Sequence, residues 1–396
     1  MTSDMSRFPA LSAVRVIVTD ADSRLGLHVI RALGQAGCVV TALAATSRGG
    51  VLGFSSRYTS KAIELPPGDY EDVLVPTIEG LGGSHDVVVP VSALSILLLQ
   101  RNLHSIESEL RTFLPPPEAF DVAVDKRATT NAAERAGIPV PRTYHDLDPN
   151  RPDDWAATMQ EHLPLVIKFA DEKRSGSWHP GDRYQIVRSI DELRTEYRRF
   201  HKIGGPPLVQ EYVEGDGCGF FTIFGPSGDP FVTFCHRRLR EYPISGGPST
   251  LCESIHDPIL VDLGTRLLKA LNWRGVAMVE FKQDRKTGEY KLLEINPRFW
   301  GSLPLAIQSG INFPAYQVQM ALGQEAAPPG PYPLGKKMRF FLPDLLAVVD
   351  QWRTHNKKSV IRSYVSELLD LSIKDGLFDL RDPMPFVTYV RRNIKR

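Results

Sequence analysis

The chain has 396 residues, of which 42% are hydrophobic and 23% are charged, as is usual for globular proteins. This chain is too long to fold around a single ordinary hydrophobic core, so its length predicts two or three domains. The 47 basic and 46 acidic residues leave a net charge of +1, so no overall field would attract nucleic acid or an anionic membrane, and we expect neither as a partner.

The cysteines and the apolar segments indicate the cellular compartment of the protein. The four cysteines form no C-x-x-C pair, and the N-terminal residues lack the basic start and apolar stretch of a secretory signal. The longest apolar run, residues 87–99, is interrupted by Pro90 and two serines and is shorter than the ~20 residues that span a bilayer. These features predict a reduced, cytoplasmic protein.

The first third of the chain alternates between strand and helix patterns. Residues 14–19 are typical of a buried strand, residues 25–37 have helical spacing and end at a glycine, and residues 39–44 again resemble a strand. This β-α-β order predicts a parallel sheet with a right-handed crossover. Residues 86–91, followed by a helix after Ser92, continue the pattern.

A dinucleotide-binding domain is the alternative interpretation of this region. The loop after the first strand, TDADSRLG, contains only Gly26, whereas the dinucleotide fingerprint needs three glycines at G-x-G-x-x-G. NAD binding is therefore poorly supported. Three consecutive prolines, 115–117, mark the end of the unit.

Two lysines follow in contrasting settings. Lys126 stands at the predicted start of a helix over residues 128–136. Lys168 lies inside an apolar strand, residues 164–170. A buried ammonium group needs a partner or a lowered pKa, and a phosphate is a suitable partner.

The next segments are polar and rich in glycine. Residues 171–183 are small, polar and basic, as expected of a mobile loop in which Gly176 and its neighbours offer backbone N–H groups to phosphates. A strand over residues 208–214 leads into a G-x-G-x-G run, residues 215–219. No helix follows these glycines, so we expect them to form a bend or a bulge rather than a nucleotide loop.

A strand-like segment, FVTFCHRRLREYP, carries a cluster of cations. Strand alternation places His236, Arg238 and Arg240 on one face and Arg237 on the other. Three cations on one face repel unless an anion lies among them, and arginine suits bidentate contacts with carboxylate or phosphate. The pattern leaves two interpretations open: a pocket for an acidic substrate, or a solvated face.

The most informative segment is residues 275–301, GVAMVEFKQDRKTGEYKLLEINPRFWG. Two strand patterns flank a Lys-Thr-Gly turn, which predicts a β-hairpin. If the hairpin is symmetric about Thr287, Glu280 lies opposite Glu294, and such a like-charge pair destabilises the sheet unless a cation neutralises it. Asn296 shares a face with Glu294 and adds an amide oxygen. These oxygen donors suit Mg²⁺ or Mn²⁺ held together with phosphate.

The order of acidic strand, turn, E-I-N-P-R and Gly-Ser loop resembles the metal-binding hairpin of the ATP-grasp superfamily, with the greatest similarity to the carbamoyl-phosphate-synthase-like carboxylate-amine ligases. The segment D-K, helix, A-G-I-P-V-P at residues 125–141 is similar to the entry segment of that superfamily. The resemblance implies that Glu280, Glu294 and Asn296 hold two Mg²⁺ ions on the phosphates of ATP, and that Arg298 steadies the transferring phosphoryl group.

The resemblance also assigns the nucleotide contacts. It implies that Lys126 and Lys168 reach phosphates, that Glu211 and the backbone of Val213 hold adenine, and that Asp216 contacts the ribose. Where the superfamily has a glycine-rich lid, this chain has a single Gly176 between serines. This departure leaves the residues that cover the phosphates undecided.

The fold that the resemblance implies is α/β and α+β with several domains. Residues 1–117 would form a parallel-sheet, Rossmann-like pre-ATP-grasp domain. Residues 118–335 would form a two-subdomain ATP-grasp domain, with a lid subdomain at about 140–210. Residues 336–396 would form a helical C-terminal extension that ends in a solvated basic tail.

The implied function is that of an ATP-dependent carboxylate-amine ligase that releases ADP and phosphate. Arg298, Arg240 and Lys168 are the predicted catalytic residues, with ATP and Mg²⁺ or Mn²⁺ as cofactors. The expected partners are small, amino-acid-like carboxylate and amine substrates, and a homodimer is compatible with the resemblance. The alternatives are an enzyme that consumes bicarbonate, as a carboxylase or carbamoyl-phosphate-type enzyme, and a non-catalytic nucleotide-binding regulator.

Overall fold

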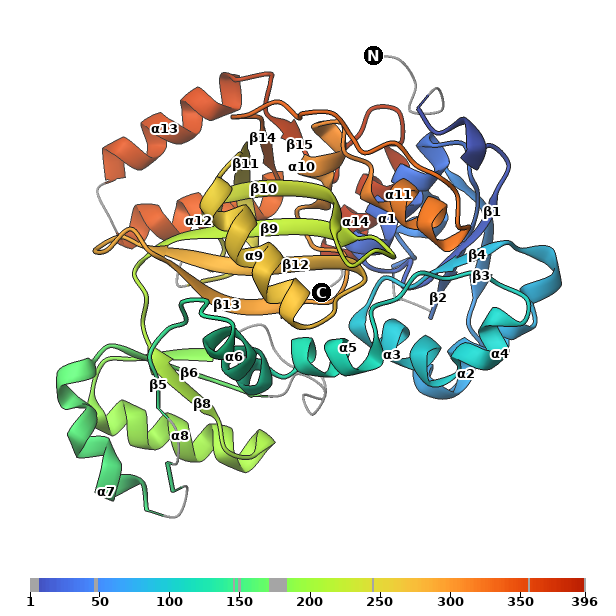
Figure 1. Ribbon diagram of the computed structural model, residues 1–396. Helices are drawn as coiled ribbons and strands as arrows, with labels where there is room; N and C mark the ends of the chain where they lie inside the picture. Colours follow the sequence, from blue (N-terminus) through green and yellow to red (C-terminus); the bar gives the residue numbers. More distant parts are fainter. Residues whose placement is uncertain are drawn as a thin grey trace.

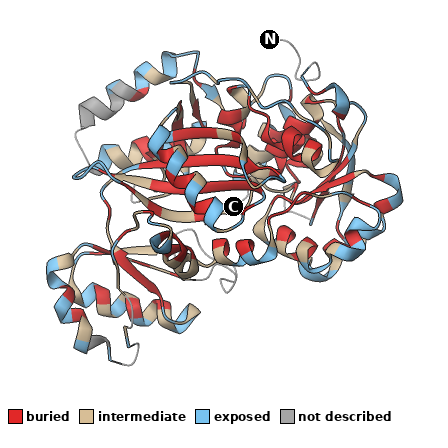
Figure 2. Ribbon diagram, viewed as in Figure 1, coloured by how far each residue is buried: buried red, intermediate tan, exposed pale blue. Residues whose placement is uncertain are grey.

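The computed structural model describes residues 7–45, 49–144, 147–148, 151–170, 184–243, 246–354 and 357–394. Three β-sheets organise these residues, with helices packed around them (Figure 1). Buried residues are concentrated in the largest sheet and in the helices that cover it (Figure 2). Among the described residues, no helix combines the length and apolar character needed to cross a membrane. All four cysteines are free and buried.

The N-terminal sheet is parallel, with the strand order β3-β2-β1-β4. Its strands are β1 (Arg15–Val18), β2 (Val39–Ala44), β3 (Thr59–Glu64) and β4 (Val87–Val89). Its helices are α1 (Arg24–Gln35), α2 (Tyr70–Glu79), α3 (Ala93–Arg101) and α4 (Leu103–Glu107). The predicted β-α-β unit is confirmed. Ser92 ends the loop after β4 by accepting a hydrogen bond from Ser95 N, which caps α3.

Two helices connect this sheet to the rest of the molecule: α5 (Pro117–Val124) and α6 (Lys126–Arg135). Asp125 separates them, and its carboxylate accepts hydrogen bonds from the backbone N–H groups of Arg127 and Ala128 at 2.8 and 2.9 Å. This N-cap starts α6 where the sequence predicts it. Lys126 is therefore the first residue of α6, in a fixed position.

A small antiparallel sheet forms a separate lobe at the lower left of Figure 1. Its strands, in the order β5-β8-β6-β7, are β5 (Thr143–Tyr144), β8 (Leu208–Glu211), β6 (Leu165–Lys168) and β7 (Tyr184–Val187). Its helices are α7 (Pro152–Ala156) and α8 (Ile190–Gly204). A core of its own, which includes Leu193, Tyr197 and Phe200 of α8, holds this lobe together.

The large sheet has seven strands in the order β13-β12-β9-β10-β11-β14-β15. They are β9 (Gly215–Phe224), β10 (Pro230–Glu241), β11 (Ser249–Ile255), β12 (Gly275–Asp284), β13 (Tyr290–Asn296), β14 (Lys337–Arg339) and β15 (Lys374–Asp375). One face packs on α5, α6 and α9 (Pro258–Ala270). The other packs on α10 (Leu303–Gln308) and α11 (Phe313–Ala321), and through them on α1.

The glycines at the start of β9 correct an expectation. The strand pairs without interruption along β12, from Gly215 opposite Asp284 to Phe224 opposite Gly275, so no bend or bulge is present there. The glycines instead leave room for neighbouring side chains. A Cβ on Gly219 would lie 2.4 Å from the ring of Phe221, and a Cβ on Gly217 would lie 2.9 Å from Arg238 Cδ.

The C-terminal segment contains strands as well as helices. β14 and β15 extend the large sheet, and the helices are α12 (Phe341–Thr354), α13 (Lys357–Leu369) and α14 (Met384–Ile394). The chain then returns to the N-terminal sheet, where buried Asp382 accepts a hydrogen bond from Arg31 Nε at 2.8 Å. Arg392 Nη1 donates to the carbonyl of Asp22 at 2.6 Å. The basic tail, expected to be solvated, thus contacts the start of the protein.

Candidate functional site

The hairpin of β12 and β13 places Glu280 directly opposite Glu294, as the sequence predicts. The hairpin is not, however, symmetric about Thr287 as the sequence analysis supposes. Near the turn, Gln283 pairs with Tyr290, and the register shifts by one residue between Glu280 and Phe281. The shift is a bulge at Leu293, which returns Glu294 to its place opposite Glu280.

Asn296 lies on the same face as the two carboxylates. Its Nδ2 donates a hydrogen bond to Glu294 Oε1 at 3.0 Å. Its cross-strand neighbour is Met278, two residues before Glu280. The expected grouping of two carboxylates and one amide is therefore present on one face of the hairpin.

Two basic side chains neutralise the carboxylate pair in this structure. Lys126 Nζ lies 3.0 Å from Glu294 Oε2, and Arg238 Nη2 lies 2.7 Å from Glu280 Oε2. All four side chains are largely buried, with exposed fractions between 12% and 27%. Like charges at this spacing need such neutralisation.

The two carboxylates differ in acidity. Burial raises the pKa of Glu280, and the negative charge of Glu294 adds to the rise, although Arg238 opposes it. Burial also opposes ionisation of Glu294. The positive charges of Lys126 and Lys168 and the hydrogen bonds from Lys126 and Asn296 outweigh burial, and together they hold the pKa of Glu294 well below the usual range. Glu294 is therefore the stronger acid of the pair.

Lys168 approaches the hairpin from the small sheet. Its Nζ lies 3.5 Å from the carbonyl oxygen of Leu293, the residue at the bulge. Lys126 N also donates to the carbonyl of Ala170, which follows β6, at 2.8 Å. The structure thus brings both predicted lysines, from different elements, to the Glu294 side of the hairpin.

A second ion pair lies along the same edge. Lys291 Nζ lies 2.5 Å from Glu211 Oε1 and 3.4 Å from Asp284 Oδ2. Burial would raise the pKa of Glu211, but the hydrogen bonds from Lys291 and from the backbone of Arg142, together with the positive charges of these two residues, outweigh burial and lower the pKa. Val213, two residues beyond Glu211, is buried. Sequence reasoning missed Lys291, although the adjacent Leu292 and Leu293 break strand alternation and signal the bulge.

Two predicted residues, Asp216 and Arg240, lie away from the carboxylate pair. Asp216 pairs with Gln283, on the sheet face opposite the carboxylates, and its Oδ1 lies 3.8 Å from Arg285 Nη2. Strand alternation thus turns the side chain of Asp216 away from the carboxylate pair, and its contact with ribose stays a prediction. The predicted Gly176 lies outside the described residues.

Arg240 joins a buried network under the C-terminal helices. Its Nε and Nη2 donate to the two carboxylate oxygens of Asp344 in α12, at 2.9 and 3.0 Å, and Nη2 also donates to Glu367 in α13. The register of β10 against β11 shifts twice between Arg238 and Glu241, which breaks the expected alternation. Arg240 therefore stabilises the fold, and Arg238 takes the place beside the carboxylates.

His236, the other member of the expected basic face, is buried and uncharged. Burial lowers its pKa well below the usual value. Its Nδ1 lies 3.1 Å from Ser302 Oγ, at the start of α10, and its ring packs edge-on against Phe221. His236 thus links the large sheet to α10 and adds no positive charge.

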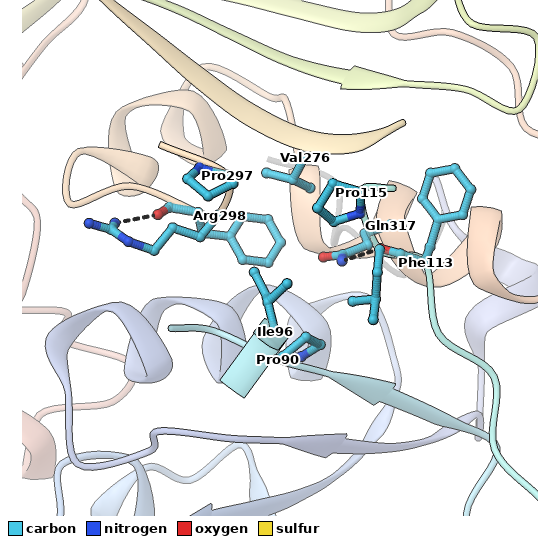
Figure 3. Close-up of a pocket in the computed structure, with 10 residues that line it drawn as sticks. Pro90, Ile96, Phe113, Pro115, Val276, Pro297, Arg298 and Gln317 are labelled. Carbon is cyan, nitrogen blue, oxygen red and sulfur yellow. Dashed lines mark hydrogen bonds between the residues drawn. The ribbon is translucent and has the colours of Figure 1, made fainter. Parts of the chain in front are cut away.

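Arg298 follows Asn296 by two residues and lies in the loop before α10. Its Nη1 donates to the carbonyl oxygen of Phe299 at 2.9 Å. Figure 3 shows its side chain extending away from a small cavity that Arg298 helps to line together with mainly apolar residues, among them Pro90, Ile96 of α3 and Phe113, which lies between α4 and α5. That cavity lies under the loop and does not include the carboxylate pair.

Comparisons with known proteins give one family match. A family model described as "ATP-grasp in the biosynthetic pathway with Ter operon" matches residues 232–339, which include β10, the hairpin and Arg298. The chain is 31% identical over 241 residues to acetyl-CoA carboxylase 1 of Oryza sativa subsp. japonica, a match that covers 53% of this chain and 10% of that protein. The chain thus spans only a small part of the length of the acetyl-CoA carboxylases it matches.

Two further comparisons cover more of the protein that is matched. The chain is 27% identical over 291 residues to the D-alanine–D-alanine ligase of Granulibacter bethesdensis, covering 68% of this chain and 80% of the ligase. A solved structure of the biotin carboxylase domain of Hydrogenobacter thermophilus 2-oxoglutarate carboxylase, a dimer in complex with MgADP, ADP and bicarbonate, superposes with a TM-score of 0.62 at 16% identity, covering 81% of this chain and 73% of that one. This likeness shows the fold.

We expect Arg240→Ala to destabilise the protein. The change leaves Asp344, which has no exposed surface, without its guanidinium partner, and removing one partner of a buried ion pair costs about 3–5 kcal/mol. Denaturant unfolding measures the loss. Arg237→Ala is the control, because Arg237 pairs with Glu253 at the surface with 44% of its side chain exposed, and that pair is worth about 1 kcal/mol or less. Equal stability of the two variants would contradict the role given to Arg240.

Proposed function

Because the chain belongs to the ATP-grasp superfamily, we propose that it is an ATP-dependent ligase that joins a small carboxylate to an amine through an acyl phosphate. The observation that carries the proposal is the pairing of Glu280 with Glu294 next to Asn296, with Lys126 and Lys168 converging on Glu294. This arrangement combines acidic and amide oxygens with basic groups, as a site for metal-bound phosphates requires.

The residues present fit a magnesium ion. Glu280, Glu294 and Asn296 offer hard oxygen donors on one face, and the two carboxylates already have basic side chains where a metal cation would supply charge. Among the described residues no group of three His, Cys, Asp or Glu side chains is arranged for a metal, so nucleotide oxygens and water would complete the coordination. A bound Mg²⁺ would neutralise the charge of the transferring phosphoryl group.

The side chains of the protein would position and neutralise the reactants. Lys126 and Lys168 would hold phosphate oxygens, and Arg298 would stabilise charge that develops on the phosphoryl group. Glu211 and the backbone of Val213 would hold adenine at the end of β8 in the small sheet. Such a site works by orientation and preorganised charge and needs no side-chain nucleophile.

The proposed chemistry has two steps. A carboxylate oxygen of the acceptor bonds to the γ-phosphorus of ATP while the bond to the leaving oxygen of ADP breaks. The amine nitrogen then bonds to the acyl carbon, phosphate leaves with the oxygen that bridged it, and the amine loses a proton. The products are an amide, ADP and phosphate.

Bicarbonate is the second candidate for the acceptor. The names of two compared proteins favour it, since one is a carboxylase and the other is a biotin carboxylase domain crystallised with bicarbonate. The D-alanine–D-alanine ligase, of which the chain covers a larger share, favours an amino-acid carboxylate. A non-catalytic regulator has less support, because metal donors, phosphate-binding lysines and Arg298 occur together.

Trapping with hydroxylamine tests the acyl phosphate. When hydroxylamine replaces the amine in a screen of amino acids and small carboxylates, we expect a hydroxamate of the true substrate, with ADP and phosphate as coproducts. Bicarbonate-dependent phosphate release without any hydroxamate would select the second candidate. Formation of AMP and pyrophosphate would reject the mechanism.

Glu294→Gln should abolish Mg²⁺-dependent ATP turnover while the protein stays folded. The amide keeps the shape of the side chain and an oxygen that can accept from Asn296, but it removes the negative charge that a metal requires. Turnover and the thermal unfolding midpoint are to be measured together. Glu289→Gln, on the exposed hairpin turn, is the matched control and should keep full activity. Full activity in Glu294→Gln would remove the metal site from the hairpin.

Arg298→Lys should lower kcat by about a hundredfold, comparable to the loss of one oxyanion donor, with little change in the KM for ATP. Lysine keeps the charge but not the planar fork of donors. Steady-state kinetics with Arg237→Lys as a surface control would measure the effect. A raised KM with unchanged kcat would mean that Arg298 binds ground-state substrate and does not act on the transition state.

A further inference from the structure

Side chains of the protein itself occupy the two carboxylates of the hairpin. Glu294 Oε2 lies 3.0 Å from Lys126 Nζ, and Glu294 Oε1 accepts the hydrogen bond from Asn296 Nδ2, also at 3.0 Å. Glu280 Oε2 lies 2.7 Å from Arg238 Nη2. An ammonium and a guanidinium thus hold the positions where a metal cation would supply charge, so a metal that binds both carboxylates has to displace one of them.

The two cations are not held in the same way. Arg238 lies over Gly217, where a Cβ would come within 2.9 Å of the arginine Cδ, and its Nη1 also lies 3.4 Å from Glu241 Oε2. The Lys126 ammonium is a compact charge on a flexible four-carbon stem. Its backbone is fixed, because its N–H donates to the carbonyl of Ala170 at 2.8 Å, but its side chain can swing about this point. Lys126 is therefore the cation that can leave its carboxylate without disturbing the fold.

The protein alone balances the charges of the carboxylate pair. Two carboxylates face two cations, and Lys168 brings a further positive charge to the Glu294 side, where its Nζ lies 3.5 Å from the carbonyl oxygen of Leu293. A divalent cation added to this group would create a positive excess in a largely buried place, and the displaced ammonium would lose its partner. Metal binding at the hairpin is therefore unfavourable unless an anion enters as well.

A nucleotide phosphate can supply this anion. Lys126 and Lys168 lie on the same side of Glu294, although they come from different elements, α6 and β6. Two ammonium groups placed in this way also suit a phosphate, which offers more oxygens and more charge than a carboxylate. Transfer of the Lys126 ammonium from Glu294 to a phosphate would make Glu294 available to the metal when the negative charge that the metal needs arrives.

We propose that Lys126 couples metal binding to nucleotide binding: it holds Glu294 when no nucleotide is bound, and it transfers to a nucleotide phosphate when the metal takes Glu294. The inference rests on the proposed ATP-dependent function and deepens it. The coupling is reciprocal, because linkage requires the metal and the nucleotide to change each other's affinity by the same factor. The Lys126–Glu294 pair thus opposes the binding of either ligand alone and favours the binding of both together.

Lys126→Met tests the metal side of the coupling in the whole chain. Methionine keeps an unbranched apolar stem and removes the charge. Mn²⁺ is titrated without nucleotide and followed by electron paramagnetic resonance. We expect Lys126→Met to bind Mn²⁺ about tenfold or more tightly than the unaltered protein, because the competing bond between charged groups is gone. Lys269→Met is the control, since it removes the same charge from an exposed pair with Asp229 and should leave Mn²⁺ affinity unchanged.

Glu294→Gln tests the nucleotide side of the coupling. ADP is titrated calorimetrically after EDTA has removed divalent cations. Glutamine releases Lys126, so we expect metal-free ADP to bind about tenfold more tightly to Glu294→Gln, with no change in Glu289→Gln on the exposed turn. Weaker repulsion between residue 294 and the phosphates would also raise the affinity, so the double variant Lys126→Met/Glu294→Gln decides the cause. The gain from Glu294→Gln disappears in the Lys126→Met background if the lysine carries the coupling.

The outcomes separate this inference from the proposed function. Equal Mn²⁺ affinity of Lys126→Met and the unaltered protein overturns the coupling, and so does a gain in ADP affinity from Glu294→Gln that persists without Lys126. In both cases, binding of ADP together with Mn²⁺ would leave the ATP-dependent function standing. Failure of the unaltered protein to bind ADP with Mn²⁺ would instead reject that function and the coupling with it. If Lys126→Met does not fold, Lys126→Gln replaces it, with the same expected gain in Mn²⁺ affinity.

Discussion

The direct opposition of Glu280 and Glu294 across two neighbouring strands is the constraint around which the site is arranged. A like-charge pair at this distance destabilises the sheet unless positive charge lies beside it. The protein supplies that charge from two directions, with Lys126 from the capped start of α6 and Arg238 from β10. Each cation is fixed by its own local structure, the first by the Asp125 cap and the second by the missing side chain at Gly217. The basic groups and the acidic pair therefore depend on each other.

This dependence explains how two sheets and the connecting helices produce one site. The small sheet contributes Lys168 and Glu211, the large sheet contributes the hairpin and Arg238, and the connecting helices contribute Lys126. Lys126 N donates to Ala170 O, and Lys291 pairs with Glu211, so contacts between the lobes run through residues of the site. A ligand that draws these charges apart would change the contacts between the lobes at the same time.

Local patterns predicted much of this arrangement. The strands, the start of α6, the pairing of Glu280 with Glu294 and the shared face of Asn296 all follow from alternation and capping, which act within a few residues. Strand alternation made wrong predictions at bulges, because one extra residue reverses the face of each residue beyond it. Because of the bulge at Leu293, alternation did not identify Lys291 as a residue of the site. The register shifts near Arg240 turn its side chain to different contacts from those of Arg238. The partner of Arg240, Asp344, lies 104 residues away, beyond the reach of local patterns.

Arg238 and Arg240 show how one strand serves both stability and the site. They are two residues apart, yet one contacts a carboxylate of the hairpin and the other a carboxylate of α12. Thr250 of β11 donates to the same Asp344, so β10 and β11 are joined to α12 next to the irregular part of β10. This attachment fixes the strand from which Arg238 extends. The C-terminal segment therefore contributes to the geometry beside Glu280 without contacting it, because the position of the Arg238 guanidinium depends on how firmly the backbone of β10 is held.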